Sequence, residues 1–550
     1  MIYLSTLLIS MFITMALIPI FKGLAVKMNT MDFPNPRKVH MQPMPKIGGV
    51  AMALGTLVPV ALYANGDRFI NAVLIGSCIV VIFGIIDDLK NLGYKAKFVG
   101  QVLAALVVIF YGGLKICNLG ICLPDGAILP DFLAIPLTLI VIVGVTNAIN
   151  LSDGLDGLAG GSTLLIFLCI GYLAYTGGYL PGNYFIAVLS AAAIGAIFGF
   201  LRFNTYPATV FMGDTGSQLL GFLAITLALG LTQANSPISP FLPLILLGFP
   251  VLDTLTVMVE RISNRRSPFQ ADKNHFHHKL MRLGLFHTEA VVTIYILQAF
   301  LVVMAFIFRF YSEWFHLIFY LLFSGIIISG FVTADCNEWK LKRPDLLDIT
   351  IKGKLRILKE KNILIKVSFH FVEIAVPLLL IISILLPIEV PLYIGGISMT
   401  FAGLVLLTWI FNKQWLVGTL RLCFYLLVPI VLYQSKIDHV AWMNSKAIML
   451  YNLSFGALAF FLVLTLKFTR RQKGFKATPM DVLVLLIALV VPNLPDPRIQ
   501  SLAMGLLATK IIVLFFSFEV LVGELRGKLS RIGVWTIAAL LLVAVRGLAF

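Results

Sequence analysis

Long apolar stretches, each about as long as a membrane is thick, recur along the chain. A helix needs about 20 apolar residues to cross ~30 Å of hydrocarbon, and this criterion marks about eleven stretches before residue 335. They lie at residues 3–22, 48–64, 69–86, 98–116, 132–148, 158–178, 183–201, 217–234, 241–259, 290–310 and 315–333. The pattern predicts a core of about eleven transmembrane helices at residues 1–335.

A charged, basic segment at residues 336–366 separates this core from a second apolar region. About seven further stretches follow, at residues 367–388, 391–411, 414–433, 446–466, 480–492, 500–522 and 532–546. We therefore expect an all-α polytopic membrane protein in which 336–366 is a cytoplasmic linker and 367–550 an accessory transmembrane domain. The accessory stretches contain isolated ionisable residues, which are costly in a bilayer and suggest interior pairs, helix ends or snorkelling. These residues are Glu373, Arg421, Lys510 and Glu519.

Composition and charge support this class. Hydrophobic residues make up 59% of the 550 residues and charged residues 12%, with a mean hydropathy of +0.97. These values exclude a soluble globule, a disordered chain and a secreted disulfide scaffold. The net charge is +16. In residues 1–335 the Lys and Arg gather in alternate loops, while the intervening loops hold little beyond Arg68 and Lys115, so the basic loops are predicted to be cytoplasmic. Cys117 and Cys122 share an outward loop, where either a disulfide or two thiols is compatible with the sequence.

Five polar clusters lie in the predicted cytoplasmic loops. The first follows the first apolar stretch and contains Arg37, Lys38 and His40 ahead of a Gly pair. Arg and backbone N–H groups suit an anionic ligand, although a solvated basic loop explains the pattern about as well.

The second cluster is Asp87-Asp88, followed by Lys97. Adjacent carboxylates at a membrane boundary repel each other unless a cation relieves them, which indicates metal or phosphate chemistry, or simply pairing with nearby Lys.

The third cluster is an oxygen-rich turn between two apolar stretches, with Asn150, Asp153 and Asp156 among glycines. It suits a hard cation or a ribose and base, and helix capping would explain only one of its acids. The fourth contains Asn204, Phe211 and Asp214, where Asp214 is either a metal ligand or a helix cap.

The fifth cluster combines arginines with closely spaced histidines. The surrounding basic charge disfavours zinc and favours a diphosphate that accepts hydrogen bonds. Its members are Arg265, Arg266, His275, His277 and His278. Carboxylates for a hard cation, a basic cage and a hydrophobic scaffold together predict phosphoryl transfer involving a lipid.

These motifs resemble those of the polyprenyl-phosphate N-acetylhexosamine-1-phosphate transferases (glycosyltransferase family 4), most closely the WecA- and TagO-like branch. The resemblance covers residues 1–335 and rests on DxPNxRKxH with PxPxxGG, the DD pair, NxxNxxDGxDGLA, GDTGS and HxHH. It implies transfer of N-acetylhexosamine 1-phosphate from a UDP-sugar, UDP-GlcNAc first among them, to undecaprenyl phosphate with release of UMP. This reaction would initiate a cell-surface polysaccharide such as O-antigen or teichoic acid in the bacterial plasma membrane, with the active site facing the cytoplasm.

The resemblance also implies roles for particular residues. Asp214 would be the principal ligand of Mg²⁺, or alternatively Mn²⁺, assisted by Asn150 or the Asp87-Asp88 pair. Asp87 would contact or deprotonate the lipid phosphate. The uridine pocket would be lined by Asp153, Asp156, Asn204 and Phe211. The donor phosphates and sugar would be held by His275, His277, His278 and Arg265 or Arg266, with Arg37, Lys38, His40 and Lys97 as further substrate-binding candidates.

Three other functions compete with this one. A phospho-muramoyl-pentapeptide transferase of the MraY kind shares the carboxylate motifs, but the RKxH run and the HxHH form favour the N-acetylhexosamine branch. A lipid-linked sugar transporter would place its ionisable residues near mid-membrane rather than at helix ends. A CDP-alcohol phosphotransferase would carry a DGxxAR run, which is absent here. Related enzymes suggest a homodimer, and no nucleic-acid partner is expected.

Overall fold

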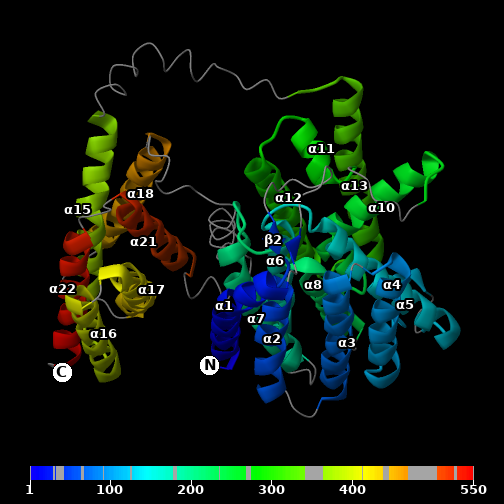
Figure 1. Cartoon of the computed structure of the whole chain (residues 1–550), viewed down its shortest axis with the longest axis horizontal. Helices are drawn as coiled ribbons and strands as arrows, with labels where there is room; N and C mark the ends of the chain where they lie inside the picture. The colour runs from blue at the N-terminus through cyan, green and yellow to red at the C-terminus, as the bar shows by residue number, and fades with distance from the viewer. Residues whose placement is uncertain are drawn as a thin grey trace. The chain divides into compact units, whose positions relative to one another are not determined.

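The computed structural model of the chain describes two compact units, each with its own helices. The described residues are 2–28, 31–32, 43–63, 67–90, 92–123, 127–177, 183–233, 236–267, 274–340, 363–411, 413–437, 445–468, 504–524 and 529–548. Figure 1 shows both units as helical bundles. Within the described ranges, eleven helices are long and apolar enough to cross a membrane, which confirms an all-α polytopic membrane protein.

Unit 1 comprises the described residues up to 340. All described residues of the five polar clusters belong to it. Its elements are α1 (Ile2–Met28), β1 (Met31–Asp32), β2 (Met44–Pro45), α2 (Gly48–Tyr63), α3 (Arg68–Lys90), α4 (Tyr94–Leu106), the π-helix η1 (Val107–Tyr111), the 3-10 helix η2 (Gly120–Cys122), α5 (Asp131–Ser152), α6 (Leu158–Thr176), α7 (Asn183–Asn204), α8 (Gly213–Gln233), α9 (Leu242–Leu246), α10 (Gly248–Ser263), α11 (Phe276–Arg282), α12 (His287–Phe308) and α13 (Glu313–Cys336).

Helix α8 lies at the centre of unit 1. Its residues from Thr215 to Thr232 are all buried, and it packs against α2, α3, α5, α6 and α7. Small residues allow the close approach: a Cβ on Gly84 of α3 would lie 2.5 Å from Cα of Thr215. A Cβ on Gly221 of α8 would lie 2.8 Å from Cα of Thr146 in α5. These contacts bring the end of α3 and the start of α8 together.

The structure corrects the predicted stretch 241–259, which is not one helix. It breaks at Leu247 into α9 and α10, and α10 continues to Ser263. Pro250 lies in the first turn of α10, where its missing N–H costs least, so a new helix can begin there but the preceding one cannot continue through it. The end of α10 thereby reaches the basic loop.

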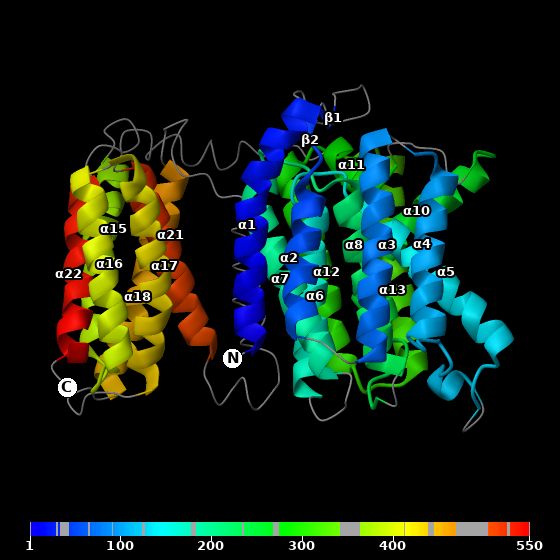
Figure 2. The ribbon, with the colours of Figure 1, turned by 60° about the horizontal axis from the view of Figure 1, so that its bottom comes forward.

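Two further local elements were not predicted. Residues Met31–Asp32 pair antiparallel with Met44–Pro45 to form a short two-stranded ribbon. Helix α11 is only seven residues long and carries the histidines of the fifth cluster. Figure 2 shows both elements at the same end of unit 1. Helix α8 also begins at Gly213, four residues earlier than the apolar pattern predicts, so its first turn includes Asp214.

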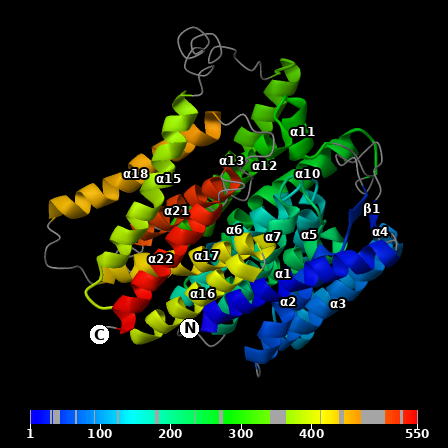
Figure 3. The same ribbon diagram turned by 60° about the vertical axis from the view of Figure 1, so that its left-hand side comes forward.

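Unit 2 contains six described helices around a separate hydrophobic core. They are α15 (Ile363–Leu385), α16 (Leu392–Phe411), α17 (Lys413–Ile437), α18 (Ser445–Phe468), α21 (Met504–Glu524) and α22 (Leu529–Leu548). Helix α15 packs against α18, as Figure 3 also shows, and α16 packs against α22. Glu373 forms an ion pair with Arg531 at 3.1 Å, and the Lys510 ammonium lies 4.2 Å from the centre of the Tyr451 ring. The predicted stretch 480–492 and the side chain of Glu519 lie outside the described residues.

The two-domain boundaries proposed from the sequence stay a prediction, since most of 336–366 lies outside the described residues. Cys117 is a free cysteine in the structure, which favours two thiols over a disulfide, while the Cys122 side chain lies outside the described residues.

Candidate active site

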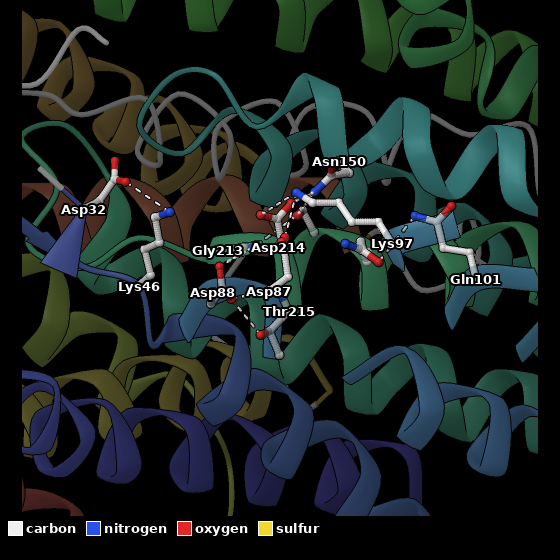
Figure 4. Close-up of polar contacts among 12 residues, drawn as sticks. Asp32, Lys46, Asp87, Asp88, Lys97, Gln101, Asn150, Gly213, Asp214 and Thr215 are labelled. Atoms are coloured by element: carbon white, nitrogen blue, oxygen red, sulfur yellow. Dashed lines mark hydrogen bonds and ion pairs between the residues drawn. The ribbon is translucent and has the colours of Figure 1, made fainter. Parts of the chain in front are cut away.

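Two carboxylates and one ammonium group form the centre of the candidate site. Asp87 comes from the last turns of α3, Asp214 from the first turn of α8 and Lys97 from α4 (Figure 4). Lys97 Nζ lies 2.6 Å from Asp87 Oδ2 and 3.2 Å from Asp214 Oδ2. Two successive helices and a third that is distant in the sequence therefore place one positive charge between two negative ones.

Asp88 has a different environment from its neighbour Asp87. Its Oδ1 accepts a hydrogen bond from the Asp214 backbone N–H (2.9 Å), and its Oδ2 accepts from the N–H and the hydroxyl of Thr215 (3.0 and 2.7 Å). These N–H groups belong to the first turn of α8, which leaves them without partners inside the helix. Asp88 thus caps α8 from another helix and fixes the position of Asp214.

Asn150, near the end of α5, orients Asp214 from the opposite side. Its Nδ2 donates to Asp214 Oδ1 at 2.6 Å and lies 2.8 Å from the hydroxyl oxygen of Ser217. The Ser217 hydroxyl donates in turn to the Gly213 carbonyl at 2.9 Å. The Asp214 carboxylate is therefore held by a neutral amide and by an ammonium, with its backbone anchored by Asp88.

A polar cavity of about 340 Å³ opens beside this cluster. Its lining combines acids, amides, aromatic rings and histidines from both ends of the unit 1 sequence. The lining residues are Asp32, Lys46, Asp88, Asn150, Asp153, Gly154, Leu155, Asp156, Asn204, Tyr206, Phe211, Gly213, Asp214, Ser217, His278 and His287. The structure thus brings together members of the second, third, fourth and fifth clusters: Asp88, Asn150, Asp153, Asp156, Asn204, Phe211, Asp214 and His278.

One wall of the cavity is held in place by side chains that bond to the backbone. Asn204 accepts from the Gly157 N–H at 2.9 Å and donates to the Val210 carbonyl at 2.9 Å. Asp156 accepts from the Ala208 N–H at 2.9 Å. These bonds tie the loop after α5 to the loop after α7, so both residues already have structural tasks in addition to lining the cavity.

The three histidines of the fifth cluster occupy different environments. His275 Nδ1 lies 2.8 Å from Asp253 Oδ2, and Asp253 Oδ1 accepts from the Phe276 N–H at 2.7 Å. His277 is buried and packs against Gly154. A Cβ added to Gly154 would lie 2.3 Å from Nε2 of His277. Burial, followed by the nearby His278, His275 and His287 rings, lowers the pKa of His277 well below its usual value. Of the three, His278 alone lines the cavity.

The arginines of the first and fifth clusters differ in what the structure describes of them. Arg37, Lys38 and His40 lie outside the described residues. Arg265 and Arg266 follow the end of α10, are exposed and do not line the cavity. Lys46 does line it, and its Nζ lies 3.1 Å from Asp32 Oδ1. Burial lowers the pKa of Lys46, but the charge of Asp32 and the hydrogen bond to it outweigh this effect and raise the pKa above its usual value.

Three lining or supporting residues were not predicted from the sequence: Asp253, Tyr206 and His287. Asp253 is a single acid inside an apolar stretch, which is a signal of function or of a buried partner. His287 accepts a hydrogen bond from the Asp156 N–H at 3.2 Å and stacks on Tyr206 with ring centres 4.6 Å apart. Neither Asp253 nor His287 belongs to one of the sequence motifs, so the spacing of the motifs does not identify them. Ser217 was recognised only as part of GDTGS.

Negative charge accumulates around the cavity. Burial, followed by the charges of Asp214, Asp156 and Asp88, raises the pKa of Asp153 to about 7. Such a concentration of carboxylates favours a bound cation.

The donor set around Asp214 fits a magnesium ion. Mg²⁺ is bound in many proteins by one or two carboxylates together with substrate phosphates and water. Asp87 and Asp214 supply two carboxylates that already share one positive charge. No group of three or more His, Cys, Asp or Glu side chains at metal-binding distances occurs among the described residues, which disfavours a closed site built from protein ligands alone.

Comparison with known proteins connects this site to a family. The model of glycosyl transferase family 4 matches residues 70–232, a range that includes Asp87, Lys97, Asn150 and Asp214. A probable undecaprenyl-phosphate N-acetylglucosaminyl 1-phosphate transferase of Bacillus subtilis (strain 168) is 36% identical over 335 residues, covering 60% of this chain and 92% of the relative.

Two further relatives are similar over comparable lengths. The undecaprenyl-phosphate alpha-N-acetylglucosaminyl 1-phosphate transferase of Escherichia coli (strain K12) is 31% identical over 351 residues, covering 62% of this chain and 93% of the relative. The decaprenyl-phosphate N-acetylglucosaminephosphotransferase of Mycolicibacterium smegmatis is 36% identical over 310 residues, covering 50% of this chain and 74% of the relative.

Proposed function

The chain belongs to glycosyl transferase family 4, the polyprenyl-phosphate N-acetylhexosamine-1-phosphate transferases, and we propose that it transfers N-acetylglucosamine 1-phosphate from UDP-N-acetylglucosamine to undecaprenyl phosphate. The relatives are named for transfer to undecaprenyl or decaprenyl phosphate. The observation that carries the proposal is the Asp87–Lys97–Asp214 cluster beside a polar cavity at one end of a membrane bundle.

The proposed reaction joins two anions. An oxygen of the lipid phosphate attacks the sugar-bearing phosphorus of the donor, and the bond from that phosphorus to the bridging oxygen breaks. The bridging oxygen leaves with UMP, and the product is a lipid-linked diphosphate sugar. A phosphate monoester is already largely ionised near neutral pH, so the attack does not need a strong base. The demand on the protein is to hold two anions together and to shield their charge.

Mg²⁺, or Mn²⁺ in its place, would be held by Asp214 and Asp87, with Asn150 fixing Asp214. When bound, such an ion shields the donor diphosphate and polarises the phosphorus that is attacked. Asp88 keeps the first turn of α8 in place, so the Asp214 carboxylate meets its ligand without reorganisation. His278, at the cavity wall, is placed to donate a hydrogen bond to a donor phosphate.

The nucleotide would bind at the wall formed by the loops after α5 and α7. Phe211 and Tyr206 offer aromatic faces to a base, and Asp153 and Asp156 offer oxygens to a ribose. This arrangement supports a uridine subsite beside the acid cluster.

Unit 2 has its own hydrophobic core and carries none of the catalytic motifs, which supports an accessory role for residues 367–550. The paired Glu373 and Arg531 compensate each other's charge, so this pair supports a structural task within the unit.

The proposal is tested with the full-length protein reconstituted in liposomes that contain undecaprenyl phosphate and Mg²⁺. Radiolabelled UDP-GlcNAc, UDP-GalNAc and UDP-muramoyl-pentapeptide are compared by lipid extraction and by release of UMP. We expect UMP and labelled lipid from UDP-GlcNAc in the wild type, and neither product from Asp87→Asn or Asp214→Asn. Wild-type activity in both variants, or product from the pentapeptide donor alone, would contradict the proposal.

A further inference from the structure

Lys97 lies between the two acids that are proposed above to hold a divalent ion. Its ammonium is within 3.2 Å of a carboxylate oxygen on each of Asp87 and Asp214 (Figure 4). A magnesium ion binds carboxylate oxygens at about 2.1 Å. An ion that used these same oxygens would come within a few ångströms of the ammonium, where two positive charges repel strongly.

Asp87 depends on a single partner, Lys97, whereas Asp88 and Asp214 each have further hydrogen-bond donors. It is 2% exposed, and no backbone N–H, amide or alcohol of the described residues donates a hydrogen bond to either of its oxygens. Asp88, by contrast, accepts three hydrogen bonds, and Asp214 accepts one from Asn150. Because a buried carboxylate without compensation is costly, the ion pair with Lys97 is what allows Asp87 to stay charged.

Among the lysines that the structure describes around the site, Lys46, Lys90 and Lys95 are not placed for this task, and the Lys90 side chain is exposed. Lys46 is bound to Asp32 at the cavity wall. Lys95 is on the same helix as Lys97, but its side chain is exposed. Lys97 itself is 29% exposed at its side chain, so its long, flexible stem has room to move toward solvent.

We propose that Lys97 is a stand-in cation, which neutralises Asp87 and Asp214 while no divalent ion is bound and moves away when the ion binds. This inference rests on the proposed function, because it assumes that a divalent ion uses these two acids. It adds a role for a residue of this chain, since Lys97 competes with the metal rather than assisting its binding. The site is thereby kept intact between turnovers, at the expense of metal affinity.

The first test measures Mn²⁺ binding to full-length protein in detergent by electron paramagnetic resonance, without substrate or turnover. Lys97→Met removes the competing charge, so we expect the dissociation constant for Mn²⁺ to fall by about tenfold or more. Lys95→Met removes the same charge from the same helix at an exposed position, and its dissociation constant should stay within about twofold of the wild type. An unchanged or weaker affinity in Lys97→Met overturns the inference.

The second test uses the wild-type protein, so it does not depend on the folding of a variant. An acetylating reagent for amines is applied with and without Mg²⁺, and the modified lysines are quantified by mass spectrometry. Binding of Mg²⁺ should raise the labelling of Lys97 several-fold and leave Lys95 unchanged, and Asp214→Asn should remove the effect. Labelling of Lys97 that does not respond to Mg²⁺ in a protein that binds the ion overturns the inference.

The two proposals fail in distinguishable ways. If the wild type binds Mn²⁺ and transfers the sugar phosphate while Lys97→Met gains no affinity, the stand-in role is wrong and the proposed function stands. If the wild type binds no divalent ion, both the stand-in role and the metal-dependent part of the proposed function are overturned.

Discussion

Asp88, at the end of α3, accepts hydrogen bonds from the backbone N–H groups of Asp214 and Thr215 and so caps the helix that carries Asp214. The neighbouring Asp87 has a separate task, because successive residues of an α-helix point about 100° apart. One acid of the pair therefore faces the first turn of α8, and the other faces Lys97 and Asp214.

Asp88→Asn should impair the site through the position of Asp214. The amide nitrogen that replaces one carboxylate oxygen cannot accept a hydrogen bond, so at least one donor in the first turn of α8 loses its partner. We expect a loss of stability of about 1–3 kcal/mol and a weaker affinity for Mn²⁺. Thermal unfolding and electron paramagnetic resonance measure the two effects. Asp131→Asn is the matched control, since its surface pair with Lys115 should contribute about 0–1 kcal/mol.

Gly213→Ala should damage the same contact from the other side. Gly213 has a φ of +70°, which L-residues adopt at a cost, and a Cβ there would lie 2.5 Å from Asp88 Oδ2. We expect a lower melting temperature and at least a tenfold loss of UMP release. Gly144→Ala in α5 is the control, because a Cβ at that position would meet nothing within 4 Å. Equal behaviour of the two variants would show that the backbone at Gly213 is not constrained.

Asp253→Ala should unfold or reorient the start of α11. The change removes the acceptor for both His275 Nδ1 and the Phe276 N–H, and leaves buried polar groups without partners, at a cost of about 1–3 kcal/mol. Asp253→Asn keeps an oxygen for one of these groups, so it should be milder. Thermal unfolding compares the melting temperatures of the two variants. Equal melting temperatures for Asp253→Asn and Asp253→Ala would contradict this prediction.

The basic residues at the end of unit 1 that carries the cavity predict that this end faces the cytoplasm. Lys90 ends α3 beside the acid cluster, whereas Lys115 lies at the opposite end of the bundle, where it pairs with Asp131 at 2.8 Å. If the cavity faces the cytoplasm, a membrane-impermeant thiol reagent should label Lys115→Cys in intact cells. The same reagent should label Lys90→Cys only after the membrane is opened. The reverse pattern would place the cavity outside.

The apolar pattern was sufficient to predict the positions of the long helices. A membrane-spanning helix needs a long apolar stretch, and shorter elements do not contain one. It failed where a helix is short or broken. Helix α11 has too few residues for a periodicity, and the break between α9 and α10 depends on where Pro250 falls within a turn.

The sequence was sufficient to predict which residues form the site, but not which contact each of them makes. Asp87, Asn150 and Asp214 stood out as polar residues at helix ends, and the structure brings them together. That Asp88 would cap α8, or that Asp253 would hold His275, depends on which helix faces meet. These faces are set by contacts such as that of Gly84 with Thr215, between residues 131 positions apart in sequence, and no local pattern encodes them.

Asp153 should make the stability of the protein depend on pH near neutrality. Burial and neighbouring acids raise its pKa to about 7, from about 3.9 in an unfolded chain. The folded state therefore binds the proton more tightly than the unfolded state, and this contribution is fully present below about pH 4 and is lost as the pH rises through 7. Asp153→Asn mimics the protonated group at every pH. Its melting temperature, relative to the wild type, should accordingly increase between pH 5 and pH 8, whereas Asp131→Asn should show no such trend. A difference between Asp153→Asn and the wild type that stays constant over this range would show that Asp153 is ionised throughout, as it would be if a cation were bound beside it.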